Sequence, residues 1–218
     1  METVGCMNSI EDKSFLLMDH RIWEAVEGLT TPDPDVRDQA LEALINIKGY
    51  NKSPLVAYLL ATRISDPNIE VRFHIIQHLG RLLDFDTEGL HFSDQALVHF
   101  QEFITHLNKD QLIQLLEVAN QYLSAEKALV NILKLSSYAG AGLSGIVNDR
   151  KLPFSIRQQA VYYCGEMGYL ETKIMLQNLI DRAEKNRTKT GRKVSRRKKR
   201  DEDSFYYYAV SALEKLQP

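Results

Sequence analysis

The sequence predicts an all-α fold, an α-solenoid built from about five helical hairpins. The phrase Pro34-Asp35-Val36-Arg37 and its apolar continuation recur in related form from Pro67 and from Pro153. Apolar residues recur at three- and four-residue intervals almost throughout, and no segment alternates convincingly at every second residue. A phrase repeated after tens of residues is typical of stacked repeats, in which each unit buries its apolar face against a neighbour.

Glycine and proline residues divide this helical pattern into ten expected helices. Ser53 before Pro54, and Ser93 and Ser124 ahead of apolar runs, are typical signals for the start of a helix. The expected helices cover roughly 14–28, 34–48, 54–65, 68–84, 93–107, 109–123, 125–148, 154–168, 170–185 and 203–216.

These helices pair into five hairpins, and the second helix of each carries the same apolar register. We number each second helix from a position zero, and positions four and eight residues later then lie on the same helix face. Asn120, at the eighth position of the third hairpin, fits that apolar register poorly. The zero positions are Val36, Val71, Leu112, Ile156 and Phe205, and the fourth positions are Ala40, Ile75, Leu116, Ala160 and Ala209.

The length leaves room for one large domain or two small ones, and the repeat pattern favours one intracellular domain. Residues 14–218 form a single repeat domain after an N-terminal arm at 1–13, with a basic loop inserted at 186–202. No apolar run approaches the ~18–20 residues of a membrane span, and no signal peptide is recognised at the N-terminus. Cys6 and Cys164 are too few for a disulfide framework. We therefore expect a cytoplasmic protein without a membrane partner.

The stretch from Pro34 to Leu44, with Val36, Arg37 and Ala40 at the repeated positions, resembles the HEAT-like repeat, especially the short bacterial form also found in phycobilisome lyase-type proteins. The resemblance is clear over residues 20–84 and 150–218, and it extends to the residues between them because the helical pattern continues there. It implies a right-handed α-solenoid whose second helices line one, usually concave, face. Function belongs to the site, because this scaffold carries many functions.

Arginines follow position zero directly in three repeats: Arg37, Arg72 and Arg157. A side chain there lies about 100° round the helix, beside the apolar stripe. Such an arginine can lay its stem along the core and present its guanidinium to a carboxylate. We expect a structural role, with partners among Asp33, Asp35, Asp66 and Asp149. The resemblance also implies a ladder of Asp and Arg residues between repeats.

The positions two and six residues after zero point away from the core. Several are apolar or aromatic, which is typical of an interface. Covering loops, or isolated exposed apolar residues without a role, would explain them equally. We predict a face that binds another protein, comprising Asp38, Glu42, Phe73, Gln77, Gln114, Val118, Gln158, Tyr162, Tyr207 and Ser211.

A basic run at 185–200 carries ten cations, while the rest of the chain has 17 basic and 29 acidic residues, a net charge of −12. Such charge density attracts nucleic-acid phosphates, and tyrosines just downstream can stack on bases. A nuclear-import signal, docking on an acidic partner or on the chain's own acidic body, and a solvated loop are further readings. The nucleic-acid hypothesis rests on Lys189, Arg192, Lys193, Arg196, Arg197, Lys198, Lys199, Arg200 and Tyr206.

No motif in the sequence indicates catalysis. His74 and His78 have the spacing of a ligand pair, yet two ligands do not complete a metal site. The related deoxyhypusine hydroxylases hold iron with His-Glu dipeptides, which this chain lacks. The small residues of 140–145 follow a helix-like segment, so they indicate a kink or close helix approach and not a phosphate loop.

We therefore predict a non-enzymatic protein-interaction scaffold or adaptor without a metal or cofactor. The first alternative is nucleic-acid binding through the basic loop and adjacent tyrosines. The second, less favoured alternative is a lyase-like enzyme or enzyme accessory.

Overall fold

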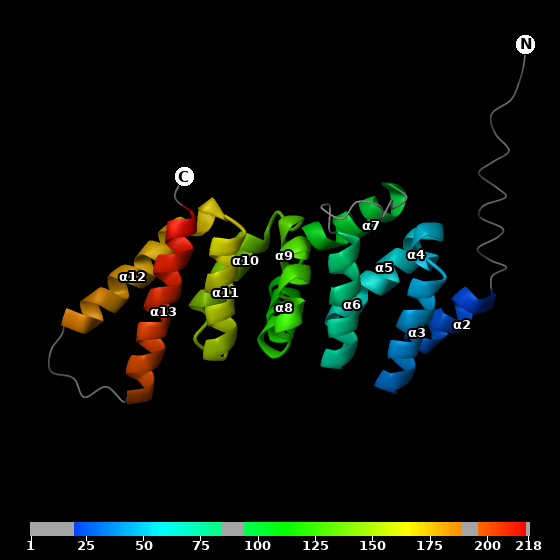
Figure 1. The fold of residues 1–218 in the computed structure, drawn as a ribbon, viewed down its shortest axis with the longest axis horizontal. Helices are drawn as coiled ribbons and strands as arrows, with labels where there is room; N and C mark the ends of the chain where they lie inside the picture. Colours follow the sequence, from blue (N-terminus) through cyan, green and yellow to red (C-terminus); the bar gives the residue numbers. More distant parts are fainter. Residues whose placement is uncertain (1–19, 84–93, 189–195, 217–218) are drawn as a thin grey trace, which may run out of the picture. The chain divides into compact units, whose positions relative to one another are not determined.

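The computed structural model describes residues 20–83, 94–188 and 196–216 (Figure 1). Within these ranges the chain forms twelve α-helices and three short 3-10 helices, and it contains no β-strand. The predicted all-α class is therefore confirmed for the described part of the chain. No helix in that part combines the length and apolar character needed to cross a membrane.

The chain divides into two compact units, Met1–Phe103 and Ile104–Pro218. Each unit is described by itself below. The single domain expected over 14–218 stays a prediction. The expected N-terminal arm at 1–13 lies outside the described residues.

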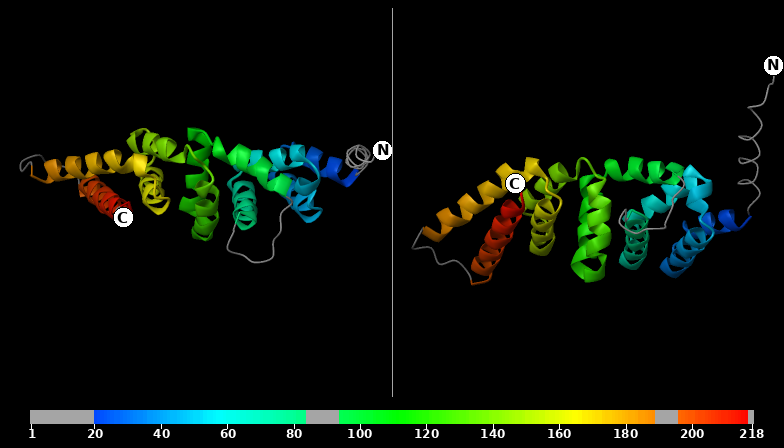
Figure 2. Two further views of the ribbon diagram at one scale, coloured as in Figure 1. Left: turned by 90° about the horizontal axis from the view of Figure 1, so that it is seen from above. Right: turned by 45° about the horizontal axis from the view of Figure 1, so that its top comes forward.

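The first unit packs its second helices side by side. α3 contacts α6 directly, α2 packs on α3, and α5 packs on α6. Seen from above, α3 and α6 form one layer and α2 and α5 the other (Figure 2). The elements are α2 (His20–Gly28), α3 (Pro34–Asn46), α4 (Gly49–Lys52), α5 (Pro54–Thr62), η1 (Arg63–Ser65), α6 (Ile69–Leu82) and α7 (Asp94–Thr105), whose last residues enter the second unit.

The second unit has the same two-layer construction. α11 lies between α8 and α13 and contacts both, while α10 packs on α8 and α11, and α12 packs on α13 (Figure 2). The elements are α8 (Lys109–Gln121), η2 (Leu123–Ala125), α9 (Glu126–Lys134), α10 (Ala139–Asn148), α11 (Phe154–Glu166), η3 (Leu170–Thr172), α12 (Lys173–Thr188) and α13 (Arg196–Lys215).

The predicted register describes the buried side of the second helices well. All five residues at the fourth position are buried, and Val71, Leu112 and Ile156 at position zero are buried too. The other two zero positions are not buried: Phe205 is half-buried, and Val36 is 39% exposed while the next residue, Arg37, is buried. The expectation that Val36 is a core residue was therefore wrong.

Two helices begin at asparagine caps that the sequence analysis did not identify. The Asn68 side chain accepts hydrogen bonds from the first turn of α6, and Asn108 forms a capping box with Gln111 at the start of α8. Ser53 precedes α5 without a side-chain capping bond, and Ser124 lies in the 3-10 helix before α9. Ser93 is outside the described residues.

The single long helix expected over 125–148 is wrong, because the chain forms α9 and α10 separated by a turn. At the break, the backbone N–H of Ser136 donates to the carbonyl of Leu133. Side chains from elsewhere bind carbonyls near the end of α9: the Tyr169 hydroxyl donates to Leu133 (2.8 Å), and the Thr105 hydroxyl donates to Leu135 (3.3 Å). These tertiary hydrogen bonds stabilise a break that periodicity alone does not predict.

Glycines allow helices of the second unit to approach closely. A Cβ at Gly165 of α11 would lie 2.6 Å from the Cα of Ala212 in α13. A Cβ at Gly142 of α10 would lie 2.4 Å from Cδ1 of Leu112 in α8. The small residues near 140 thus sit at a close helix contact.

Candidate docking site

Arg37 is a buried structural arginine in the first unit. Its Nε and Nη2 atoms each donate to one carboxylate oxygen of Asp66, both at 2.8 Å. Its Nη1 donates to the carbonyl oxygens of Thr31 (2.9 Å) and Pro32 (2.8 Å). The hydrogen bond that Arg37 donates to Asp66 is the main cause that raises the pKa of Arg37. A bidentate Asp–Arg pair of this type is what the resemblance to HEAT-like repeats leads us to expect.

The other two repeated arginines bind backbone carbonyls. Arg72 donates from Nη1 to the carbonyl oxygen of Asp66 at 2.7 Å. Arg157 donates from Nε to the carbonyl oxygen of Val147 at 2.9 Å, and its guanidinium lies 4.9 Å from the centre of the Phe205 ring. Burial is the main cause that lowers the pKa of Arg157.

The remaining predicted carboxylates shape turns. The Asp33 side chain accepts a hydrogen bond from the backbone of Asp35 at the start of α3. Asp149 pairs with Lys109 Nζ at 2.7 Å and accepts a hydrogen bond from the backbone of Lys151. The bond from Lys109 is the main cause that lowers the pKa of Asp149. Asp149 therefore joins the turn before α11 to the start of α8.

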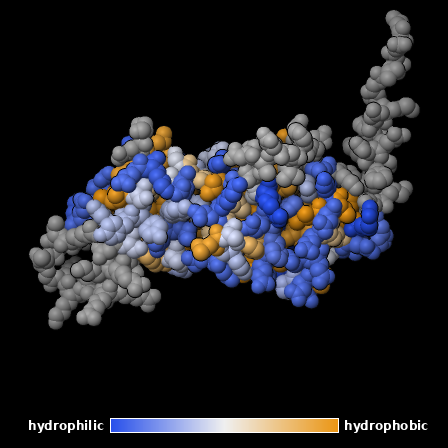
Figure 3. Space-filling view, in the orientation of Figure 1, coloured by the Kyte–Doolittle hydropathy of each residue, from blue (hydrophilic) through white to orange (hydrophobic). Residues whose placement is uncertain are grey.

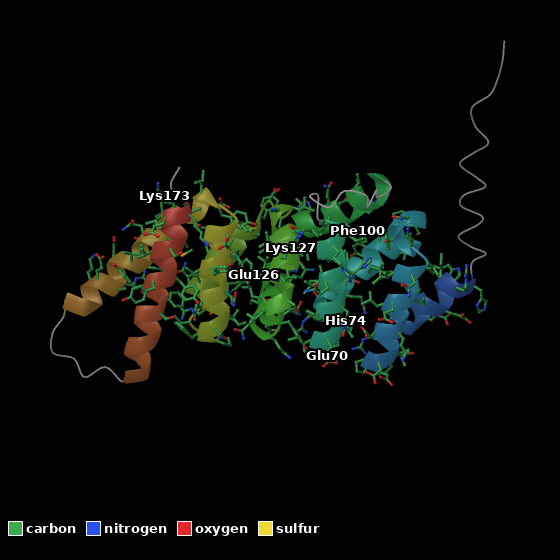
Figure 4. The ribbon with its side chains drawn as sticks, viewed as in Figure 1. Glu70, His74, Phe100, Glu126, Lys127 and Lys173 are labelled. Atoms are coloured by element: carbon green, nitrogen blue, oxygen red, sulfur yellow. The ribbon has the colours of Figure 1, made fainter. Side chains whose placement is uncertain are left out.

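Two predicted face residues of the first unit, Asp38 and Phe73, contact His74, which Figure 4 labels. The Asp38 carboxylate lies 2.6 Å from His74 Nδ1, and the Phe73 ring lies tilted at 5.7 Å from the His74 ring. Glu42 is exposed, and Gln77 is half-buried. The Asp38 carboxylate thus already has a hydrogen-bond partner within the chain, which leaves less of its surface for a binding partner.

His74 and His78 occupy different environments. His78 is buried with its ring 5.7 Å from Tyr50, and burial, together with the charge of Arg81, lowers its pKa to about 4. His74 instead pairs with Asp38 at the surface. Among the described residues, no group of three or more histidine, cysteine, aspartate or glutamate side chains could hold a metal ion.

Two predicted face residues of α8 are less accessible than the register suggests. Val118 is fully buried, so its assignment to the docking face was wrong. The reason is that α8 contacts α9, α10, α11 and η2, which widens its apolar stripe. Gln114 is half-buried, and its side-chain oxygen is buried without a hydrogen-bond partner.

The other predicted face residues of the second unit line two adjoining grooves, found among its described residues. The α8–α11 groove has a volume of about 280 Å³, and the α11–α13 groove about 240 Å³. Tyr162 and Tyr208 line both. Tyr207 is 65% exposed and Tyr208 39%. The first groove is also lined by Ala119, Asn120, Leu123, Glu126, Ser155, Gln158, Gln159 and Tyr163, and the second by Tyr207, Ser211, Ala212 and Lys215.

Charged side chains surround Tyr162 at the junction of these grooves. Its hydroxyl donates a hydrogen bond to Glu126, which Figure 4 labels in the second unit. Lys215 Nζ lies 5.4 Å from the centre of the Tyr162 ring and pairs with Glu166. Burial is the main cause that raises the pKa of Tyr162, and the bond to Glu126 adds to it. Tyr162 is therefore a neutral hydrogen-bond donor at neutral pH.

Glu126, Tyr208 and Lys215 line the grooves, and Glu166 pairs with Lys215, yet the predicted face contained none of these residues. Glu166 and Lys215 both lie ten residues after position zero, so extending the register by one turn identifies this pair. Glu126 belongs to a first helix, which the register of second helices does not include. The face over α11 and α13 is mainly pale in hydropathy colour, consistent with tyrosine side chains (Figure 3).

The basic run is partly helical. α12 extends to Thr188 and α13 begins at Arg196, seven residues before the expected start at 203. The expectation of a basic loop over 186–202 was therefore wrong at both ends, and Arg196–Arg200 form the first turns of α13. Lys189, Arg192 and Lys193 lie outside the described residues.

Tyr206, the aromatic residue of the nucleic-acid hypothesis, is half-buried. Its hydroxyl donates to Glu184 of α12 at 3.4 Å, and its ring meets that of Tyr207 edge-on. Tyr207, one residue further along α13, presents more of its ring to solvent.

Cys164 is a core residue of α11. Its side chain is fully buried, and burial raises its pKa to about 12. The thiol therefore stays protonated at neutral pH, which does not suit a nucleophile.

The chain matches no protein-family model, no curated protein and no solved structure. The likeness to HEAT-like repeats therefore stays a prediction based on the repeated residues. The binding chemistry of the site is therefore inferred from the residues that line the grooves, which are mainly aromatic side chains, amides and a few charged groups.

Proposed function

We propose that this protein is a non-enzymatic interaction scaffold that binds another protein through the exposed face of its second helices. The observation that carries this proposal is the pair of tyrosine-lined grooves on α8, α11 and α13. Aromatic residues with a polar end are enriched at protein interfaces, because they combine apolar area with hydrogen bonding. The predicted face residues that line these grooves are Gln158, Tyr162, Tyr207 and Ser211.

We also propose that the helix pairs belong to a right-handed, HEAT-like α-solenoid of about five hairpins. Three features support this: the common buried register, the side-by-side second helices within each unit, and ion pairs that join successive repeats. Arg37–Asp66 and Lys109–Asp149 are pairs of this kind. Such a scaffold offers an extended surface suited to binding a protein segment.

Site-specific photo-crosslinking tests the scaffold function. A photo-reactive phenylalanine analogue replaces Tyr207 in one variant and Tyr138 in a matched control, because Tyr138 is similarly exposed at 61% and lies outside both grooves. We expect nuclease-resistant protein adducts from position 207 in lysate of the native host and few from position 138. Equal adduct patterns at the two positions contradict the proposal.

Nucleic-acid binding is the second candidate, and the continuity of α13 favours it. Arg196 and Arg200 lie eleven and seven residues before Tyr207 on this helix, so their positions share its register. Basic residues on the same helix as an exposed aromatic residue suit a single strand, through phosphate attraction and base stacking.

The test of this second candidate is a salt titration. A labelled single-stranded oligonucleotide should bind with an affinity that falls steeply as salt rises. Replacing Arg196–Arg200 with glutamine should abolish binding while circular dichroism remains helical. Unchanged affinity in that variant rejects the candidate.

A further inference from the structure

We propose that the α11–α13 groove receives a lysine or arginine side chain from a basic segment of the partner protein. This inference rests on the proposed scaffold function and names the chemistry of the partner. It is built on one corner of the second unit, where Tyr162, Tyr207 and Tyr208 line a groove that also contains Lys215.

The groove already contains a cation of this chain. Lys215 Nζ lies 5.4 Å from the centre of the Tyr162 ring and is paired with the Glu166 carboxylate. An ammonium group over a tyrosine face and beside a carboxylate is the environment that a bound lysine requires. The position of Lys215 therefore shows that the α11–α13 groove accommodates an ammonium group.

The rings next to Lys215 offer further area for a second cation. Tyr207 and Tyr208 line the same groove, and 65% and 39% of their respective surfaces are exposed. The faces of tyrosine rings carry negative partial charge, which attracts ammonium and guanidinium groups. The exposed rings thus extend the environment of Lys215 along the groove.

Carboxylates make the electrostatic environment favourable for cations. Glu126 accepts the hydrogen bond of Tyr162 from one side, and Glu166 approaches from the end of α11. Burial is the main cause that raises the pKa of Tyr162, and the two carboxylates add to it. The C-terminal end of α11 adds the negative end of its helix dipole near Glu166.

The charge of the whole chain points to the same kind of partner. Outside residues 185–200, the chain has 17 basic and 29 acidic residues, so its net charge there is −12. An acidic surface attracts a basic segment at long range and increases its association rate. A lysine- or arginine-rich segment therefore fits both the groove and the net negative charge of the chain outside residues 185–200 better than a proline-rich or acidic segment does.

Fluorescence anisotropy with a short labelled peptide of alternating lysine and serine tests the inference. The full chain should bind this peptide, and it should not bind the same peptide with glutamine in place of lysine. Tyr207→Ala should weaken binding by about fivefold to thirtyfold, the range that one cation–π contact provides. Tyr138→Ala is the matched control and should leave binding unchanged.

Lys215→Met is the decisive variant, because it should raise the affinity for the peptide and not lower it. Removal of the built-in cation leaves the Tyr162 ring and Glu166 to the peptide, so affinity should rise by about threefold to tenfold. A merely structural role of Lys215 would leave the affinity equal or lower it. Glu166→Gln should weaken binding, and circular dichroism of every variant should match that of the unchanged chain.

The results separate this inference from the scaffold function. Absence of lysine-peptide binding, equal binding of the glutamine peptide, or unchanged or lower affinity in Lys215→Met overturns the inference. Tighter binding of a proline-rich peptide also overturns it. Protein adducts at position 207 would then still support the scaffold. If neither adducts nor peptide binding is observed, both proposals fail.

Discussion

The two units join successive helix pairs with different chemistry. In the first unit, Arg37 and Asp66 form a buried bidentate pair whose side chains are almost inaccessible to solvent. In the second unit, Lys109 and Asp149 form the comparable link, and both side chains remain partly exposed. A buried pair has strict geometric requirements, whereas an exposed pair is screened by water and salt. The comparison indicates that ion pairing is structural in the first unit and secondary in the second.

The second unit instead relies on close helix packing and an aromatic surface. Gly165 brings α11 against Ala212 of α13, and the tyrosines beside this contact form grooves. In the first unit, the predicted face residues Asp38 and Phe73 are each already in contact with His74. The second unit is therefore the better candidate for docking.

The largest expected effect comes from removing one member of the buried pair. Asp66→Ala leaves Arg37 buried without its carboxylate and should lower the free energy of unfolding by about 3 kcal/mol. Asp149→Ala is the matched change in the second unit and should have a much smaller effect. Urea unfolding followed by circular dichroism measures both. Similar losses in the two variants would contradict the contrast between the units.

The second prediction concerns the close packing of α11 on α13. Gly165→Ala places a methyl group against the backbone of Ala212 and should lower the free energy of unfolding by about 1–3 kcal/mol. In Gly142→Ala the new methyl meets only the end of the Leu112 side chain, which can move. Thermal unfolding should therefore rank Gly165→Ala as the less stable variant, and the reverse order would argue against this packing.

The third prediction is a difference in pH dependence. His78 in the first unit has a pKa lowered to about 4, below its unfolded value of 6.5. Its neutral form stabilises the fold above pH 6.5, and this stabilisation is lost as the pH falls toward 4. Between pH 7 and pH 5 the loss should be about 2 kcal/mol.

His78→Gln is the variant that isolates this effect. Its free energy of unfolding should vary less between pH 7 and pH 5 than that of the unchanged chain. Urea unfolding at both pH values provides the comparison. An equal pH dependence in the two proteins would show that His78 is not the responsible group.

The smallest expected effect is that of Tyr162→Phe. The ring and its packing remain, while the hydrogen bond to Glu126 is lost, so stability should fall by about 1 kcal/mol. Tyr169→Phe is a useful comparison, because Tyr169 donates to a backbone carbonyl at the end of α9. Thermal unfolding measures the stability of both variants. An unchanged stability in both would show that these hydrogen bonds do not stabilise the fold.

Periodicity and breakers predicted most of the helices, because a helix in this chain buries residues at regular spacing. The fourth positions from Ala40 to Ala209 are buried because each faces the core of its own unit. Val118 was misplaced, since its burial depends on how many neighbours α8 has. The break between α9 and α10 depends on hydrogen bonds from Thr105 and Tyr169, which lie far from it in the sequence.

The start of α13 was missed for a different reason. A block of like charges suggested a loop, yet arginine and lysine have good intrinsic helix propensity. Asp201, Glu202 and Asp203 follow at a spacing of four residues from Arg197, Lys198 and Lys199, and opposite charges at this spacing favour a helix. Tyr208 and Glu126 escaped the predicted site because a groove between helices depends on tertiary packing.

The most direct measurement of the docking face is the yield of protein adducts from position 207 relative to position 138, with the lysine–serine peptide added as a competitor. The account predicts a high ratio that falls toward one as the peptide is added. A ratio near one from the beginning would contradict the claim that the tyrosine grooves of the second unit are a protein-binding surface.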